Sequence, residues 1–165
     1  MKVDMVKLVT FQLGADLFAA DVFSVERVLR YVAPNSVPDV PEWIEGVLEH
    51  RGQVIPVVDL RRRIGVPAGD ATADTRIIVL TTTDGWIGAI VDAVHEVAAV
   101  PSSAVAAPPP LFRGLSAEFV SGIAKVREQL VVVLDVDRVL TSADRIAFER
   151  AAGQTAVPAV PATRG

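Results

Sequence analysis

The feature of this sequence that most constrains its fold is an internal duplication. Residues 43–64, WIEGVLEHRGQVIPVVDLRRRI, align without a gap on residues 119–140, FVSGIAKVREQLVVVLDVDRVL. The identical pairs are Gly46/Gly122, Arg51/Arg127, Gln53/Gln129, Val57/Val133, Asp59/Asp135 and Arg62/Arg138. Because polar Arg, Gln and Asp recur at fixed spacing, the match exceeds what two valine-rich strands would share. It predicts two halves of similar architecture.

The duplication extends upstream at a different offset. Residues 7–20, KLVTFQLGADLFAA, align with residues 76–89, RIIVLTTTDGWIGA, and SVERV at 24–28 aligns with AVHEV at 93–97. The change of offset falls in connecting loops, where insertions are tolerated. The two halves therefore span residues 5–67 and 74–142.

Each half has the pattern of several short β-strands. Segments such as MVKLVTFQLG, SVERVLRYV and VIPVVDL are rich in β-branched residues and are separated by Gly, Pro, Asp and Asn, which is typical of a small barrel. Aromatic residues are only 5% of the chain whereas hydrophobic residues are 51%, so the core is expected to be aliphatic. We predict one mainly β domain of about ten strands.

The composition argues against several classes of function. The chain has no cysteine, which excludes disulfide bonds, iron–sulfur clusters and thiol catalysis, and its net charge of -4 argues against nucleic-acid binding. The two histidines, His50 and His95, lack the spacing of a metal site. With no long apolar run or signal peptide, we expect a cytoplasmic protein without membrane insertion. We predict no catalytic residue, metal or cofactor, and hence no enzyme.

His50 and Asp59, which stand on either side of the apolar segment VIPVV, at first suggest a catalytic pair. The second half keeps the aspartate as Asp135 but has Val126 in place of His50, so the pair is not preserved. Both aspartates stand where an apolar strand meets a helix-like segment. We therefore expect each carboxylate to cap the first helical turn.

The recurrent arginines and glycines are interpreted as structural. Arg51 and Arg127 follow a strand-like segment, and a guanidinium there can bind loop carbonyls or a carboxylate, with contact to a partner as the alternative. Gly46 and Gly122 are assigned a structural role. The run at residues 61–63 is expected to be solvated, because three consecutive charges spread round a helical turn.

The end of the chain divides into two parts. Residues 142–152, SADRIAFERAA, begin with an N-cap serine and predict a C-terminal helix. Residues 153–165, GQTAVPAVPATRG, are small and punctuated by proline, which predicts a disordered tail.

Over residues 5–145 the chain resembles the CheW family of chemotaxis coupling proteins. The resemblance is carried by the ordered motifs Pro38/Pro41, Gly46/Val47, Arg51/Gly52 and Pro56/Val57/Asp59/Leu60/Arg61. It implies two intertwined five-stranded SH3-like β-barrels with short helices and a C-terminal helix. Residues 15–82 would form one barrel, and residues 5–13 plus 84–140 the other, each half lending its first strand to the opposite barrel.

The resemblance also implies an adaptor that couples the cytoplasmic tip of chemoreceptors to the regulatory domain of the histidine kinase CheA, in the cytoplasm or at membrane receptor arrays. The implied receptor-groove residues are Val25, Arg27, Val28, Arg51, Val91 and Val94. Arg27 stands where the family usually has glutamate, and Glu49–His50 replaces a more typical Asn-Leu. The alternative is therefore an accessory CheW-like protein that binds the kinase but not a chemoreceptor, in a non-motility pathway.

Overall fold

Strands dominate the computed structural model, which describes residues 4–107 and 119–139. The first half supplies β1 (Met5–Leu13), β2 (Asp16–Asp21), β3 (Val25–Arg30), β4 (Ile44–His50) and β5 (Gln53–Asp59). The second half supplies β6 (Arg76–Thr82), β7 (Gly85–Val91), β8 (Ala93–Pro101), β9 (Val105–Ala106), β10 (Val120–Val126) and β11 (Gln129–Leu134). The helices are short: α1 (Leu60–Ile64), η1 (Val22–Ser24), η2 (Ser102–Ala104) and η4 (Val136–Arg138). The mainly β prediction is confirmed.

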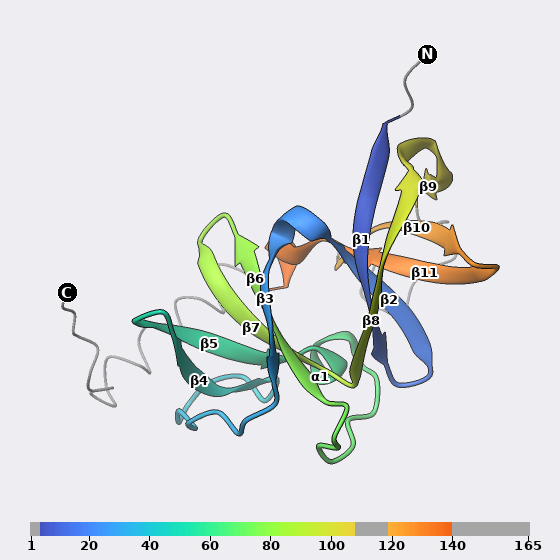
Figure 1. The fold of residues 1–165 in the computed structure, drawn as a ribbon. Helices are drawn as coiled ribbons and strands as arrows, with labels where there is room; N and C mark the ends of the chain where they lie inside the picture. Colours follow the sequence, from blue (N-terminus) through green and yellow to red (C-terminus); the bar gives the residue numbers. More distant parts are fainter. Residues whose placement is uncertain (1–3, 108–118, 140–165) are drawn as a thin grey trace.

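The strands form two curled sheets that lie side by side (Figure 1). The β1 sheet has the order β8-β1-β2-β11-β10-β9, and the β3 sheet has the order β3-β6-β7-β5-β4. Each sheet therefore combines the first two strands of one half with the later strands of the other. The expected intertwining of the two halves is confirmed.

The exchanged unit is a hairpin, which corrects the expected barrel ranges of 15–82 and 5–13 plus 84–140. Strand β2 stays beside β1, with Leu8 opposite Asp21 and Leu13 opposite Asp16, and β7 stays beside β6. A two-residue turn, in which Gly14 has φ +64°, joins β1 to β2. Because so short a turn holds two strands as antiparallel neighbours, both strands of the hairpin lie in the sheet that contains the later strands of the other half.

The duplication extends to the register of the strands. An irregularity between Ile44 and Gly46 in β4 recurs between Val120 and Gly122 in β10. Both glycines lie where a neighbouring segment approaches closely. A Cβ atom on Gly46 would lie 2.0 Å from the Asn35 carbonyl oxygen, and one on Gly122 would lie 2.7 Å from a Val105 methyl carbon. Glycine at these two positions therefore permits the packing of the adjacent segment.

One hydrophobic core joins the two sheets. Its largest cluster combines Phe11 and Phe18 of the β1 sheet with Val58 and Ile78 of the β3 sheet. The rings of Phe11 and Phe18 stack with centroids 6.4 Å apart. This cluster is the core that the two sheets share. Two smaller buried clusters each belong to one sheet, one around Leu8 and Val131 in the β1 sheet and one around Val57 and Ile77 in the β3 sheet.

An arginine of α1 joins the halves at the duplicated aromatic position. The Arg63 guanidinium lies 4.2 Å from the ring centroid of Trp43 and 4.5 Å from that of Phe119, the aligned residue of the second half. Its Nε donates to the Val139 carbonyl at 2.7 Å. Cation–π and hydrogen-bonding contacts therefore both cross between the halves.

Two expectations concern the end of the chain. The predicted helix at 142–152 and the predicted tail at 153–165 lie outside the described residues. Within residues 4–107 and 119–139, no helix has the length and apolar character needed to span a membrane.

Candidate functional site

A buried aspartate and arginine lie at the junction of β5 and α1. The Asp59 carboxylate caps α1 by accepting from the backbone N–H of Arg61 at 3.0 Å. The Arg61 side chain returns to the same carboxylate, with Nε donating to Oδ1 at 2.9 Å and Nη2 donating to Oδ2 at 3.0 Å. Arg61 is only 4% exposed, so the expectation of a solvated basic run is wrong at this position.

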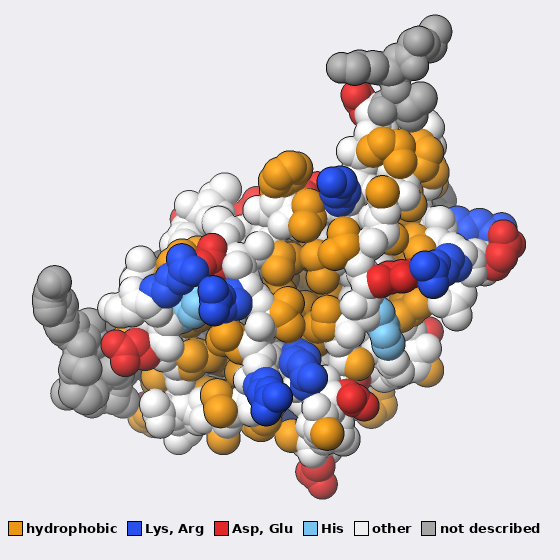
Figure 2. Space-filling model, in the orientation of Figure 1, with side chains coloured by type: hydrophobic (Ala, Val, Ile, Leu, Met, Phe, Trp, Pro, Cys, Tyr) orange, Lys and Arg blue, Asp and Glu red, His pale blue; other side chains and the backbone are white. Residues whose placement is uncertain are grey.

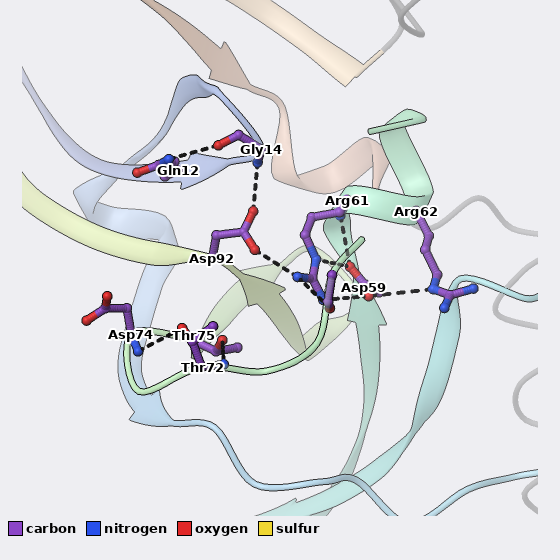
Figure 3. A network of polar contacts seen from close by, with 10 residues as sticks. Gln12, Gly14, Asp59, Arg61, Arg62, Thr72, Asp74, Thr75 and Asp92 are labelled. Atoms are coloured by element: carbon purple, nitrogen blue, oxygen red, sulfur yellow. Dashed lines mark hydrogen bonds and ion pairs between the residues drawn. The ribbon is translucent and has the colours of Figure 1, made fainter. Parts of the chain in front are cut away.

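Asp92, which follows β7, extends this ion pair into a network that reaches the β1 sheet (Figure 3). Arg61 Nη1 donates to Asp92 Oδ1 at 2.8 Å, and the backbone N–H of Gly14 donates to Asp92 Oδ2 at 2.7 Å. Since Gly14 lies in the β1–β2 turn, the network fastens the exchanged hairpin to the β3 sheet. We call Asp59, Arg61, Asp92 and Gly14 the Arg61 network.

The Arg61 network has the electrostatics of a structural element. Hydrogen bonding to Asp59 raises the pKa of Arg61 most strongly, Asp92 raises it further, and burial opposes both. The guanidinium therefore stays charged, and its donors are occupied by two carboxylates and the Gly69 carbonyl. A guanidinium that is held by two carboxylates and has a raised pKa offers no acid or base for catalysis.

In the second half, a hydrogen bond between a carboxylate and a turn holds the exchanged hairpin. Asp135 caps η4 by accepting from the backbone N–H of Asp137 at 3.1 Å. Asp137, which aligns with Arg61, accepts from the backbone N–H of Thr83 at 2.8 Å. Thr83 lies in the β6–β7 turn and aligns with Gly14. The turn of each exchanged hairpin is thus hydrogen-bonded to a carboxylate: Gly14 donates to Asp92, and Thr83 donates to Asp137.

Arg51 and Arg127 lie at the tips of the β4–β5 and β10–β11 hairpins. Both have φ +51°, and the next residues, Gly52 and Glu128, also have positive φ, as a type I′ turn requires. Arg51 pairs with Glu26 of β3 at 3.3 Å, and Arg127 pairs with Glu96 of β8 at 3.0 Å. Both arginine side chains are mostly exposed, so these pairs join strand to turn without forming a buried clamp.

Three implied receptor-groove residues lie on β3, and one lies on β8. Val28 is 40% exposed and Arg27 is exposed, whereas Val25 and Val94 are half-buried against the shared core. Val91 is 0% exposed, so its assignment as a contact residue is wrong. It lies in β7, a strand flanked by β6 and β5, where alternate side chains point into the core.

Hydrophobic side chains gather across the centre of one face, between the two sheets (Figure 2). The connector η1 joins β2 of one sheet to β3 of the other and carries Phe23, whose side chain is 92% exposed. Phe23 was missed by the sequence reasoning. Its signal was a large apolar residue in a connector directly after a strand. With Val28 it provides apolar surface for a partner.

His50 is a buried ring with no catalytic partner. It packs edge-on against Trp86, with ring centroids 5.0 Å apart. Its Nε2 lies 3.7 Å from Glu26 Oε2, which is beyond hydrogen-bonding distance. Among the described residues, no group of three or more His, Asp or Glu side chains is placed to hold a metal ion.

Comparison with known proteins identifies the family. A family model described as CheW-like domain matches residues 7–144. The chain belongs to the CheW family. It is 30% identical over 152 residues to "Chemotaxis protein CheW" of Bacillus subtilis (strain 168), which covers 92% of each chain. "Protein FrzA" of Myxococcus xanthus is 30% identical over 129 residues, covering 77% of this chain and 80% of that protein.

A solved CheW structure has the same fold. The crystal structure of scaffolding protein TtCheW from Thermoanaerobacter tengcongensis superposes with a TM-score of 0.80 at 33% identity, covering 86% of this chain and 96% of that chain. The CheW motif Pro-Val-x-Asp-Leu-Arg ends here in Asp59 and Arg61, which form the buried ion pair. Glu26, which precedes Arg27 in β3, supplies a carboxylate to Arg51.

Proposed function

We propose that this CheW-family protein is a cytoplasmic, non-enzymatic adaptor that couples the cytoplasmic tip of chemoreceptors to the regulatory domain of the histidine kinase CheA. The observation that carries the proposal is the apolar surface between the sheets (Figure 2), together with the exposed Phe23 of the connector η1 and Val28 of β3. The names of the relatives, chemotaxis and scaffolding proteins, support it. The protein would reach membrane receptor arrays by binding its partners.

The receptor contact is a helix-in-groove interaction. A helical hairpin lays an apolar stripe over Val25 and Val28 of β3 and Val94 of β8, and Phe23 lies at the end of the stripe. Arg27 is exposed on the same strand as Val28. It therefore favours a receptor segment with an acidic residue at the facing position.

The kinase contact is of a different kind. A regulatory domain with SH3-like barrels docks against a barrel of this protein through strand ends and hairpin tips. Such an interface leaves the apolar surface between the sheets free. One adaptor can then bind the kinase and the receptor simultaneously.

A second function is favoured by one observation. Arg27 gives β3 an exposed positive charge where the resemblance to the CheW family leads us to expect a glutamate. An accessory protein that binds the kinase without a chemoreceptor, in a non-motility pathway, has no need of the family's receptor charge pattern.

Two binding measurements separate these functions. The full chain is titrated with the regulatory domain of the cognate kinase and, separately, with a cytoplasmic receptor fragment. Binding to both supports the adaptor, binding to the kinase alone selects the accessory protein, and binding to neither contradicts both.

Arg27→Glu tests the receptor surface. We expect this substitution to change the affinity for the receptor fragment and to leave kinase binding unaltered, because the charge is reversed only on β3. The matched control is Arg30→Glu, which makes the same charge change at an exposed position near the end of the same strand. Equal effects of the two substitutions would remove Arg27 from the interface.

A further inference from the structure

A cavity of about 610 Å³ opens in the curled β1 sheet. Leu17 of β2, Val126 of β10 and Val131 of β11 line it, and Glu96 and Arg127 stand in its wall. Its size falls within the range of about 300–1,000 Å³ that is typical of ligand pockets. The cavity is separate from the apolar surface between the sheets.

The β3 sheet fills the corresponding space with two rings. Leu17 lies opposite Gln12 in the β1–β2 hairpin, as Trp86 lies opposite Thr81 in the aligned β6–β7 hairpin. Val126 pairs with Gln129 as His50 pairs with Gln53. Trp86 and His50 are thus the counterparts of Leu17 and Val126.

The rings of Trp86 and His50 contact each other in the β3 sheet. Two aliphatic side chains at the same positions of the β1 sheet leave the cavity open. The duplication therefore indicates which kind of group fits there, because one copy of the barrel already contains it.

A slot continues from this cavity. It has a volume of about 350 Å³ and is lined by residues 96–100 of β8 and 125–127 at the end of β10. The slot and the cavity share Glu96, Val126 and Arg127. Strand β8 ends the β1 sheet within the described part of the chain, so its outer edge is available to an extended segment.

The charges beside the cavity favour a neutral occupant. Arg127 pairs with Glu96 at 3.0 Å, and Lys125 pairs with Glu128 at 3.5 Å. These charges neutralise each other in pairs, so the lining has no unpaired Arg or Glu side chain to attract an ion. His95 also lines the cavity, and its Nε2 lies 3.2 Å from Gln12 Oε1. The Gln129 side-chain amide, which has no hydrogen-bond partner among the described residues, lines the cavity and can bind the polar edge of a ring.

We infer that this cavity binds an aromatic side chain, tryptophan-like in size, which an extended segment of a partner protein inserts from the slot between β8 and β10. The inserted ring takes the place that Trp86 and His50 occupy in the β3 sheet. The inference goes beyond the proposed function, since it holds for whichever protein carries the segment.

The test uses the full chain with methyl groups labelled for NMR and N-acetyl-L-tryptophanamide as the probe. We expect a saturable shift of the Val131 methyl resonances. Ile55, the counterpart of Val131 in the first half, serves as the internal control and should not shift. No shift of Val131 up to the solubility limit of the probe would overturn the inference.

A double substitution provides the matched control. Leu17→Trp with Val126→His rebuilds the ring pair of the β3 sheet in the β1 sheet. We expect the folded variant to lose the probe-induced shift of Val131, with its other methyl resonances in place. Undiminished binding by this variant would show that the probe does not occupy the cavity and would refute the assignment.

The source of the ring is tested by changing the probe. If the natural occupant is a side chain of a peptide segment, we expect the capped, neutral probe to bind at least as tightly as free tryptophan. Tighter binding of the free zwitterion would instead identify a small molecule as the occupant. Shifts of Val131 that depend on protein concentration, without any probe, would identify a second copy. Either of these results would overturn the inference of a partner segment.

Discussion

The substitution Asp92→Ala provides a quantitative test of the Arg61 network. It removes the 2.8 Å hydrogen bond from Arg61 and the 2.7 Å hydrogen bond from the backbone N–H of Gly14. Hydrogen bonds to a charged group each contribute about 1.5–3 kcal/mol, so the two together give an upper range of about 3–6 kcal/mol. Arg61 keeps its two bonds to Asp59 and is not left as an unpaired buried charge.

The expected loss is smaller than that upper range. The Asp92 side chain is 30% exposed, so water replaces part of the lost bonding. We therefore expect the free energy of unfolding to fall by about 2–3 kcal/mol. With a urea m-value of about 2 kcal/mol/M, the midpoint of unfolding falls by about 1 M.

Urea unfolding followed by circular dichroism measures this shift. The control is Asp74→Ala, which removes the same charge from an exposed position in the nearby loop (Figure 3). We expect the control to stay within about 0.5 kcal/mol of the parent protein. Equal, small changes in the two variants would refute the conclusion that the network fastens the exchanged hairpin.

Three further predictions concern the interface, the backbone and the shared core. Phe23→Ser is expected to weaken binding of the receptor fragment while changing stability by less than about 0.5 kcal/mol, because the ring is 92% exposed; unchanged affinity in the titration would exclude Phe23 from the interface. Gly46→Ala is expected to lower the melting temperature sharply, whereas Gly69→Ala, whose Cβ would meet nothing within 4 Å, serves as the tolerated control; a normal melting curve for Gly46→Ala would contradict the close approach. Limited proteolysis is expected to give no stable fragment of residues 15–70, since its strands lie in both sheets. Isolation of such a folded fragment would contradict the conclusion that the two sheets depend on a shared core.

Sequence reasoning reached the architecture because the duplicated residues are tied to local backbone geometry. Gly46 and Gly122 mark equivalent irregular positions, and Asp59 and Asp135 mark equivalent strand-to-helix junctions. Each of these is determined by neighbours in the same segment. A gap-free alignment of the two halves therefore carries that information.

The errors arose where a residue depends on distant segments. Arg61 was expected to be solvated, yet one of its partners is Asp92, which is 31 residues away and lies between two strands. Val91 belongs to a plausible surface motif but lies in a strand with neighbours on both sides. The exchange of a whole hairpin depends on pairing between halves. None of these contacts leaves a periodic signal in its own stretch of sequence.

The exchanged hairpins also determine how the two halves are held together. A chain with only one half would need a second molecule to complete its sheets, and dilution would separate the two. In the full chain the complementary half is covalently attached, so its effective concentration is high and independent of the amount of protein. The two halves are always present in equal number, and each can carry substitutions that its counterpart lacks. One such divergence is the ring pair of Trp86 and His50 in the β3 sheet, where the β1 sheet has Leu17 and Val126 at the equivalent positions.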